Sequence, residues 1–247
     1  RARDLAPRFD QPLLGLAQVQ VMRGRPAEAI PFLEEALRMT PEPQPALFTR
    51  AAIVYARAGR LRDGIVFLDS LRLTGAPEAY RFAALGMLRE RSGDPEGALA
   101  AYRAALENDP GVSRALQGAY HLLKQKGDLA ELARLLSRSV DVEAISVSVR
   151  ASNWLALTRE LQGDREQARA VLLRALDKSP DDVMTLTNLG SMLVREDRAQ
   201  EGLVYLDRAY ERRPRGLEVL VNLIVAHGKM GSLDRARRYF SEAEAVG

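Results

Sequence analysis

Few of the side chains that commonly carry out chemistry are present in this sequence. Its 247 residues include no cysteine and 2 histidines, His121 and His227. Without cysteine there is no disulfide, no thiolate metal site and no cysteine nucleophile. Neither histidine has a glutamate or a second histidine at the spacing of a metal-binding motif. Most metal and catalytic-triad chemistry therefore lacks its ligands.

Paired carboxylates could serve general acid–base chemistry, and adjacent pairs occur at Glu34–Glu35 and Asp181–Asp182. Neighbouring residues diverge on a helix, and paired aspartates are also typical of a solvated turn. The sequence contains no glycine-rich phosphate loop and no serine-hydrolase or zinc-protease motif. We therefore predict that the chain is not an enzyme and that it uses no metal and no cofactor.

The composition is that of a folded protein with a slightly basic balance. Hydrophobic residues make up 47% of the chain, and 36 basic residues face 33 acidic ones. These values are typical of a globular chain rather than a disordered one. Arginine far outnumbers lysine, which indicates a bacterial genome rich in G and C. The compartment stays open between cytoplasm and periplasm.

The charge pattern disfavours nucleic acid as a partner, although several arginines lie near the C-terminus. In residues 183–247 ten basic residues alternate with nine acidic ones, and ten minus nine leaves a net charge of +1. Alternating signs favour solvated helix faces over a track for phosphates. No apolar run approaches the roughly 18 residues that a membrane-spanning helix needs.

Columns of similar residues recur along the whole chain and define the elements that carry these side chains. One column recurs at intervals of 34 to 36 residues and consists of Gly24, Gly59, Gly93, Gly127, Gly163, Asp197 and Gly231. It is followed by a column of mostly small residues and then by one of large residues, from Leu33 and Leu68 to Phe240. Proline closes several of the units, as Pro41 and Pro110 do. A period of this length predicts stacked repeats, each a single supersecondary unit.

Each repeat is predicted to form two helices. Apolar residues fall at helical spacing before each turn, as Leu186, Leu189 and Leu193 do. Glycine then ends the first helix, because it adopts the left-handed conformation at little cost, and Asp197 is a tolerable substitute. Asp94 is placed to open a second helix as its N-cap, with proline at the first helical position. The same column holds Asp128, Asp164 and Ser232.

This pattern resembles the tetratricopeptide repeat (TPR), a helix–turn–helix unit of 34 residues. Its motif occurs here as Phe82-x2-Leu85-Gly86, then Ala98-x3-Tyr102, Ala105 and Pro110. The resemblance covers the whole chain and implies an all-α solenoid of about seven units in a right-handed superhelix. As one solenoid spanning 1–247, its units fall at 10–44, 45–78, 79–112, 113–148, 149–182, 183–216 and 217–247, with 1–9 as the end of a preceding, truncated unit. The chain is therefore expected to be part of a longer protein.

The fourth unit departs from the pattern. Tyr120, Leu132 and Ser139 stand where the other units have smaller or different residues. The unit lacks the closing proline and is two residues longer than the 34-residue pattern. Its tail, 140–149, alternates apolar and polar residues, yet a short isolated strand has no partner. We expect an irregular helix end or a loop there, and with it a kink in the solenoid.

The resemblance also implies where a partner binds, because in this family the first helices line the concave face. The positions that carry over as candidate partner-binding residues are Arg50, Arg57, Tyr80, Met87, Arg114, His121, Arg150, Trp154, Leu157, Asn188 and Asn222. Arginines mixed with apolar side chains suit a protein or peptide with acidic and apolar residues. His227 is expected to pack between helices.

Three of these positions carry further interpretations. Trp154, the single tryptophan, is either a binding anchor or a packed core residue. Asn188 and Asn222 occupy one column of adjacent units, where an amide ladder grips peptide backbone in glycosyltransferase-linked members of the family. A clamp for a terminal carboxylate is disfavoured, because Glu218 would repel it.

The sequence therefore predicts a protein-interaction scaffold without activity of its own. The alternative is a recognition or assembly module of a larger bacterial enzyme, such as a sulfatase-like hydrolase or a glycosyltransferase, whose catalytic domain lies outside this chain. Self-association is a third expectation, because a truncated first unit leaves an uncapped apolar end.

Overall fold

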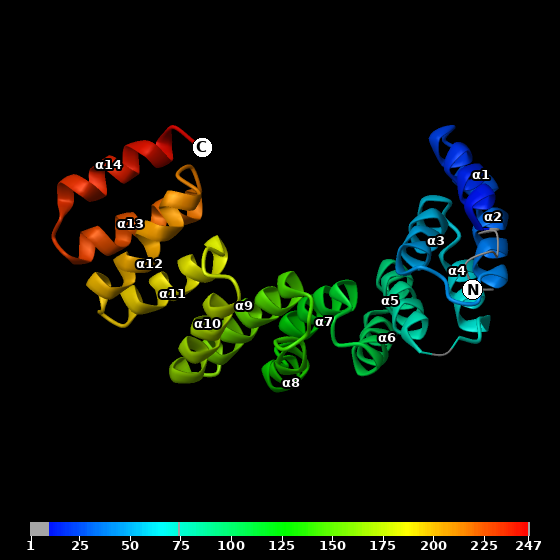
Figure 1. Cartoon of the computed structure of the whole chain (residues 1–247), viewed down its shortest axis with the longest axis horizontal. Helices are drawn as coiled ribbons and strands as arrows, with labels where there is room; N and C mark the ends of the chain where they lie inside the picture. The colour runs from blue at the N-terminus through cyan, green and yellow to red at the C-terminus, as the bar shows by residue number, and fades with distance from the viewer. Residues whose placement is uncertain (1–9, 74, 247) are drawn as a thin grey trace, which may run out of the picture. The chain divides into compact units, whose positions relative to one another are not determined.

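The computed structural model describes residues 10–73 and 75–246. Within these residues it contains fourteen α-helices and no strand (Figure 1). The helices are α1 Asp10–Met22, α2 Pro26–Met39, α3 Pro45–Arg57, α4 Leu61–Ser70, α5 Ala76–Arg91, α6 Pro95–Asn108, α7 Ser113–Lys126, α8 Leu129–Ser139, α9 Ile145–Leu161, α10 Arg165–Lys178, α11 Val183–Arg195, α12 Ala199–Arg212, α13 Leu217–Lys229 and α14 Leu233–Glu244. The all-α prediction is confirmed. The truncated unit predicted at 1–9 lies outside the described residues.

Consecutive helices pack in antiparallel pairs, as the repeat pattern predicts. The most extensively packed pairs are α1 with α2, α5 with α6, α9 with α10, α11 with α12 and α13 with α14 (Figure 1). The chain divides into two compact units, Arg1–Asp128 and Leu129–Gly247. Each has its own core, with Phe48, Tyr55 and Leu85 in the first and Leu172 and Leu206 in the second. In the described part of the chain no helix is both long and apolar enough to cross a membrane.

The glycine column supplies the turn inside the helix pairs. Gly24 has a φ of 74°, and Gly127, which ends α7, has a φ of 75°. Asp197 has a φ of 60° and is the one residue other than glycine with a positive φ in the ranges described. Aspartate tolerates this conformation better than most residues do. The predicted turn is therefore confirmed even where the glycine is missing.

The predicted N-caps are confirmed in part. Asp94 accepts a hydrogen bond from the backbone N–H of Gly97 at 2.8 Å, and Asp164 accepts one from Gln167 at 3.1 Å. Each satisfies one of the backbone donors left free at a helix start. The side chain of Ser232 makes no such bond at the start of α14, so the prediction is wrong there. A column of cap residues fixes where the turn lies, but not the rotamer of each side chain.

Tyr102 shows why small residues recur where two helices approach each other. Its fully buried ring lies on α6, and its hydroxyl donates to Glu90 at 2.7 Å. A Cβ atom added at Gly86 would lie 2.4 Å from this ring, and one added at Gly118 would lie 2.2 Å from it. The ring therefore fills the space that glycine leaves on α5 and on α7.

The segment between α8 and α9 differs in part from the sequence prediction. Residues 140–144 are irregular, as expected, but the helix begins again at Ile145, so the prediction is wrong for 145–149. Val147 and Val149 are buried there, and the polar residue between them finds partners. The hydroxyl of Ser148 donates to the carbonyl of Val140 and also accepts from Lys178 Nζ at 3.0 Å. Because these hydrogen bonds satisfy its hydroxyl, Ser148 can be buried on a helix face. The alternation of apolar and polar residues over 145–149 therefore does not indicate a strand.

Candidate functional site

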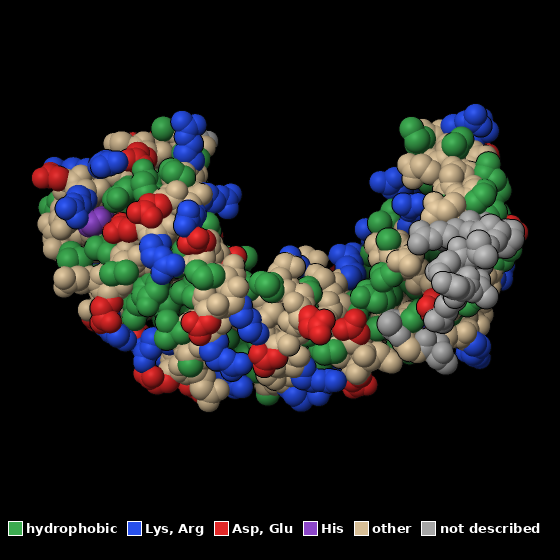
Figure 2. Space-filling view, in the orientation of Figure 1, with side chains coloured by type: hydrophobic (Ala, Val, Ile, Leu, Met, Phe, Trp, Pro, Cys, Tyr) green, Lys and Arg blue, Asp and Glu red, His purple; other side chains and the backbone are tan. Residues whose placement is uncertain are grey.

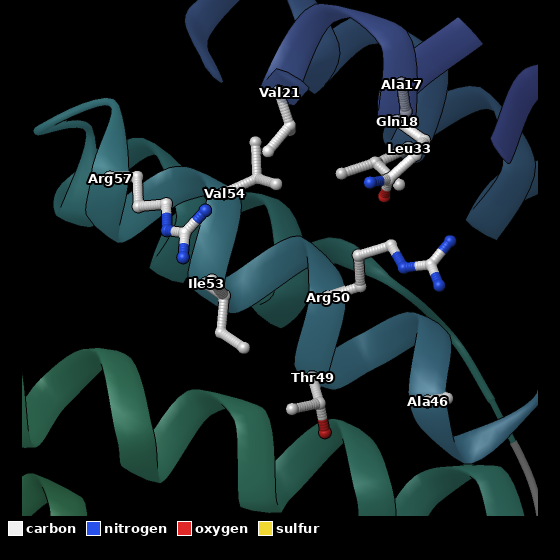
Figure 3. Close-up of a pocket in the computed structure, with 10 residues that line it drawn as sticks. All are labelled: Ala17, Gln18, Val21, Leu33, Ala46, Thr49, Arg50, Ile53, Val54 and Arg57. Carbon is white, nitrogen blue, oxygen red and sulfur yellow. The ribbon is translucent and has the colours of Figure 1, made fainter. Parts of the chain in front are cut away.

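A hollow of about 530 Å³ opens between α1 and α3 in the first unit, and we name it the α1–α3 pocket. Its lining consists of Ala17, Gln18, Val21, Leu33, Ala46, Thr49, Arg50, Ile53, Val54 and Arg57 (Figure 3). Ala17, Leu33 and Val54 are buried and give the pocket an apolar floor. Gln18 and Thr49 are exposed and add polar groups that can hydrogen-bond. The volume lies in the range of sites that bind small ligands or side chains.

Two predicted site residues, Arg50 and Arg57, lie at this pocket. Both are exposed on α3, and a separation of seven residues places them about 10 Å apart along the helix. The side chains of Ile53 and Val54 extend from α3 at positions between the two arginines (Figure 3). Neither guanidinium forms an ion pair or a hydrogen bond within residues 10–73 and 75–246. Arg60, the N-cap residue of the neighbouring helix α4, pairs with Asp63 at 2.6 Å instead.

A second hollow, of about 330 Å³, lies between α5 and α7 and is named the α5–α7 hollow. Its lining consists of Met87, Glu90, Arg91, Arg114, Gln117, Gly118 and His121. Of the predicted residues, Arg114 and His121 are exposed at this hollow. The rings of His121 and Tyr120 are in edge-to-face contact, with 5.5 Å between their centroids. Met87 borders the hollow but is only 2% exposed and belongs to the core. The structure thus brings Arg114 and His121 together on one surface, with Met87 beneath it.

The first helices of the second unit present a more apolar surface. Leu157 on α9 is 39% exposed and Val225 on α13 is 48% exposed. The cations nearby are neutralised, because Arg195 pairs with Glu160 at 2.8 Å and Lys229 with Asp197 at 2.6 Å. Acidic and basic side chains also alternate on the face of this unit seen in Figure 2. Free cationic groups of the kind at the α1–α3 pocket are therefore less prominent here.

The predicted asparagine ladder involves a further asparagine of the fifth unit, Asn153, which the repeat register places at the groove and the structure buries. Asn153 is 2% exposed, and its Nδ2 donates to the Val149 carbonyl at 2.9 Å and to Thr185 Oγ1 at 2.7 Å. Asn188 donates in turn to Asn153 Oδ1 at 2.7 Å. Asn222 donates to a carbonyl one turn earlier in its own helix, at 2.9 Å. The buried amide joins α9 to α11, a contact that repeat spacing alone does not reveal.

The remaining predicted residues are partly buried. Arg150 and Trp154 lie half-buried on α9, and Tyr80 on α5 donates its hydroxyl to Asp109 at 3.5 Å. Trp154 is half-buried, which fits both a binding anchor and a packed residue. His227 packs between helices, as expected, with its ring stacked on Tyr239 at 5.6 Å. Burial lowers the pKa of His227 below its usual range.

Metal coordination finds no support in the described residues, since no three His, Asp or Glu side chains cluster to hold an ion. The exposed groups on the first helices include guanidinium, amide and aliphatic groups. These groups bind by ion pairing, hydrogen bonding and apolar contact. The arrangement is therefore suited to recognition.

Two family models described as tetratricopeptide repeat match this sequence, one over residues 20–88 and the other over 83–133 and 121–183. Together the matches cover more than half of the chain. The chain therefore belongs to the tetratricopeptide repeat family. Repeats of this family generally serve as scaffolds for protein interaction and are typically not catalytic.

Individual relatives are more distant. The chain is 27% identical over 183 residues to cellulose synthase operon protein C of Pseudomonas fluorescens strain SBW25, a match over 70% of this chain and 14% of that protein. The structure is similar to the apo form of RapI, with a TM-score of 0.67 and 17% identity over 96% of this chain and 76% of that one. It is also similar to PilF of Pseudomonas aeruginosa, with a TM-score of 0.60 and 18% identity over 82% and 91% of the two chains. These structural similarities support the fold alone.

Proposed function

We propose that this chain is a protein-interaction scaffold that binds a peptide or a partner protein along its first helices. The observation that carries the proposal is that these helices present partly or fully exposed apolar side chains in both units and, on α3, two arginines that have no ion pair among the described residues. Arg50 and Arg57 flank Ile53 on α3, and Leu157 and Val225 are exposed on α9 and α13. An apolar surface rimmed by polar groups is typical of an interaction site.

The chemistry of the two units favours a partner with both acidic and apolar residues. Unpaired guanidinium groups attract carboxylates, and a bidentate contact fixes their orientation. Covering exposed aliphatic side chains removes apolar area from water at about 25 cal/mol per Å². The first unit would supply mainly the charged contacts and the second unit mainly the apolar ones.

Site-specific photo-crosslinking tests this proposal. A photoreactive amino acid is placed at Leu157 or Val225 on first helices, and at Val66 or Val204 on the second helices α4 and α12 as matched controls. All four side chains are exposed, so none of the substitutions should disturb the core. We expect crosslinks to a partner polypeptide from the first pair only, in extract of the source bacterium. Crosslinks from the control pair alone, or from none of the four positions, would contradict the proposal.

A second candidate is that these repeats form an assembly module within a larger bacterial system. It is favoured by the similarity to cellulose synthase operon protein C, of which the match covers 14%. A module of this kind would serve an enzyme such as a glycosyltransferase whose catalytic domain lies elsewhere. Intact-mass analysis of the native gene product tests this candidate, and a mass equal to the 27.3 kDa of this chain would contradict it. Self-association stays a prediction, which light scattering over a concentration series would test.

A further inference from the structure

The α1–α3 pocket combines an apolar floor with unpaired positive charge at its edge, and this combination limits what can occupy it. Buried Ala17, Leu33 and Val54 offer no polar partner through their side chains, so a charged or polar group seated on them would lose its hydration without compensation. An apolar side chain has no such cost. The volume of about 530 Å³ leaves room for more than one aliphatic group or for an aromatic ring.

The two arginines specify what flanks that apolar group. Arg50 and Arg57 are exposed and without an ion pair or hydrogen bond in the described ranges. Some other arginines of the same unit have carboxylate partners, as Arg38 has in Glu34 at 3.1 Å and Arg81 has in Glu78 at 2.5 Å. Two unpaired cations beside an apolar pocket thus form a surface complementary to two anionic groups with an apolar group between them.

The spacing of the arginines matches a short stretch of extended peptide. Seven residues of helix α3 span about 10 Å, and a peptide in the extended polyproline II conformation rises about 3.1 Å per residue with three residues per turn. Two acidic residues three positions apart in such a peptide lie on one side of it, about 9 Å apart, and therefore reach both guanidinium groups. The residues between them lie over Ile53 and Val54, which Figure 3 shows between the two arginines. Gln18 and Thr49 are placed to hydrogen-bond with polar groups of the same peptide.

We propose that the α1–α3 pocket binds an apolar side chain of a partner peptide while Arg50 and Arg57 pair with acidic residues on either side of it. This inference rests on the proposed function and names the partner's chemistry for one site. The pocket is distinct from the α5–α7 hollow, where Glu90 contributes a carboxylate to the lining. Phosphates of a nucleic acid would find the same two cations but would place nothing on the apolar floor.

Binding of short labelled peptides, followed by fluorescence anisotropy with the full chain, tests this inference. The probe carries Glu-Leu-Leu-Glu between Gly-Ser flanks, and two controls carry Gln-Leu-Leu-Gln and Glu-Ser-Ser-Glu. We expect each control peptide to bind at least about tenfold more weakly, which corresponds to about 1.4 kcal/mol. Equal binding of all three peptides, or stronger binding of a random oligonucleotide than of the probe, would overturn the inference.

Protein variants locate the binding. The double variant Arg50→Gln/Arg57→Gln should weaken binding of the probe about tenfold. Its matched control, Arg165→Gln/Arg215→Gln, removes the same charge from two exposed arginines of the second unit and should change binding less than twofold. Equal losses in the two variants would assign the effect to net charge and overturn the inference.

A charge-reversal variant distinguishes loss of the specific ion pairs from loss of folding. The variant Arg50→Glu/Arg57→Glu should lose the probe and gain a Lys-Leu-Leu-Lys peptide. Absence of that gain, in a variant with an unchanged circular dichroism spectrum, would overturn the inference. Crosslinks from Leu157 and Val225 arise in the second unit and report the proposed function separately. If they persist while the peptide results fail, the inference fails and the proposed function stands.

Discussion

Replacing Lys178 with methionine removes the ammonium group that holds the irregular segment between α8 and α9. Nζ of Lys178 donates to the Val140 carbonyl at 2.5 Å, to Ser148 Oγ at 3.0 Å and to Asp141 Oδ1 at 3.1 Å. Hydrogen bonds to a charged group contribute roughly 1.5–3 kcal/mol each when they are shielded from water. The Lys178 side chain is 34% exposed and Asp141 is 65% exposed, so solvent screens part of this. We expect the variant to lower the free energy of unfolding of the second unit by about 2 kcal/mol.

The single tryptophan allows the loss of unfolding free energy to be measured in the second unit. Trp154 lies on α9, so its fluorescence reports unfolding of the second unit during a urea titration. With a slope of about 2 kcal/mol per M, a loss of about 2 kcal/mol lowers the midpoint by about 1 M. The matched control is Arg174→Met, whose guanidinium pairs with exposed Asp141 at 3.1 Å and should shift the midpoint by less than about 0.3 M. An unchanged midpoint for Lys178→Met, or equal shifts for both variants, would refute the reasoning.

Three further perturbations have expected outcomes. Gly118→Ala should lower the melting temperature, because the added methyl group meets a buried ring at a cost of roughly 1–3 kcal/mol. Gly228→Ala should raise it, because nothing lies within 4 Å of the added Cβ and alanine is the better helix former by roughly 0.5–1 kcal/mol. Asn153→Ala should cost roughly 2–3 kcal/mol in a urea titration, since it leaves buried polar partners unsatisfied, whereas Asn222→Ala should cost under about 0.5 kcal/mol. Burial lowers the pKa of His227, so the folded state takes up its proton at a lower pH than the unfolded state. Stability should therefore fall as the pH drops below about 6.5, and His227→Phe should flatten that dependence in melts recorded from pH 7.5 to pH 5.5.

Each of these outcomes can fail in a specific way. Equal melting temperatures for the two glycine variants would show that close packing does not set the small-residue column. Equal costs for the two asparagine variants would show that the buried amide network contributes nothing beyond one exposed hydrogen bond. A pH dependence that survives His227→Phe would assign it to other groups. Burial raises the pKa of Asp207, which makes it one such group.

The fold could be predicted from the sequence because its determinants are local and repeated. The turn at Asp197 and the N-cap at Asp94 follow from residue type and position within a 34-residue period. Packing of Tyr102 against Gly86 follows from the same columns of small and large residues. The helical state of 145–149 could not be predicted, because burial and the hydrogen bonds of Ser148 outweigh the local alternation.

The candidate site was predictable only in outline. The first-helix positions were placed from the repeat register, yet Met87 at one of them is buried in the core. Whether an arginine is free or paired depends on contacts between repeats, as the ion pair of Arg195 with Glu160 shows. Arg57 and Arg195 occupy the same position of their repeats, two residues before Gly59 and Asp197, yet Arg195 forms an ion pair and Arg57 forms none among the described residues. The α1–α3 pocket likewise depends on helix packing, which spacing does not specify.

Hydroxyl-radical footprinting of the chain with and without its crosslinked partner tests the central claim most directly. The claim is that the first helices form the binding surface. We expect the oxidation rates of Leu157, Met184 and Val225 to fall several-fold in the complex, while those of Val66 and Val204 on second helices stay within about twofold. Protection of the second-helix side chains, with the first-helix side chains still fully reactive, would contradict the account.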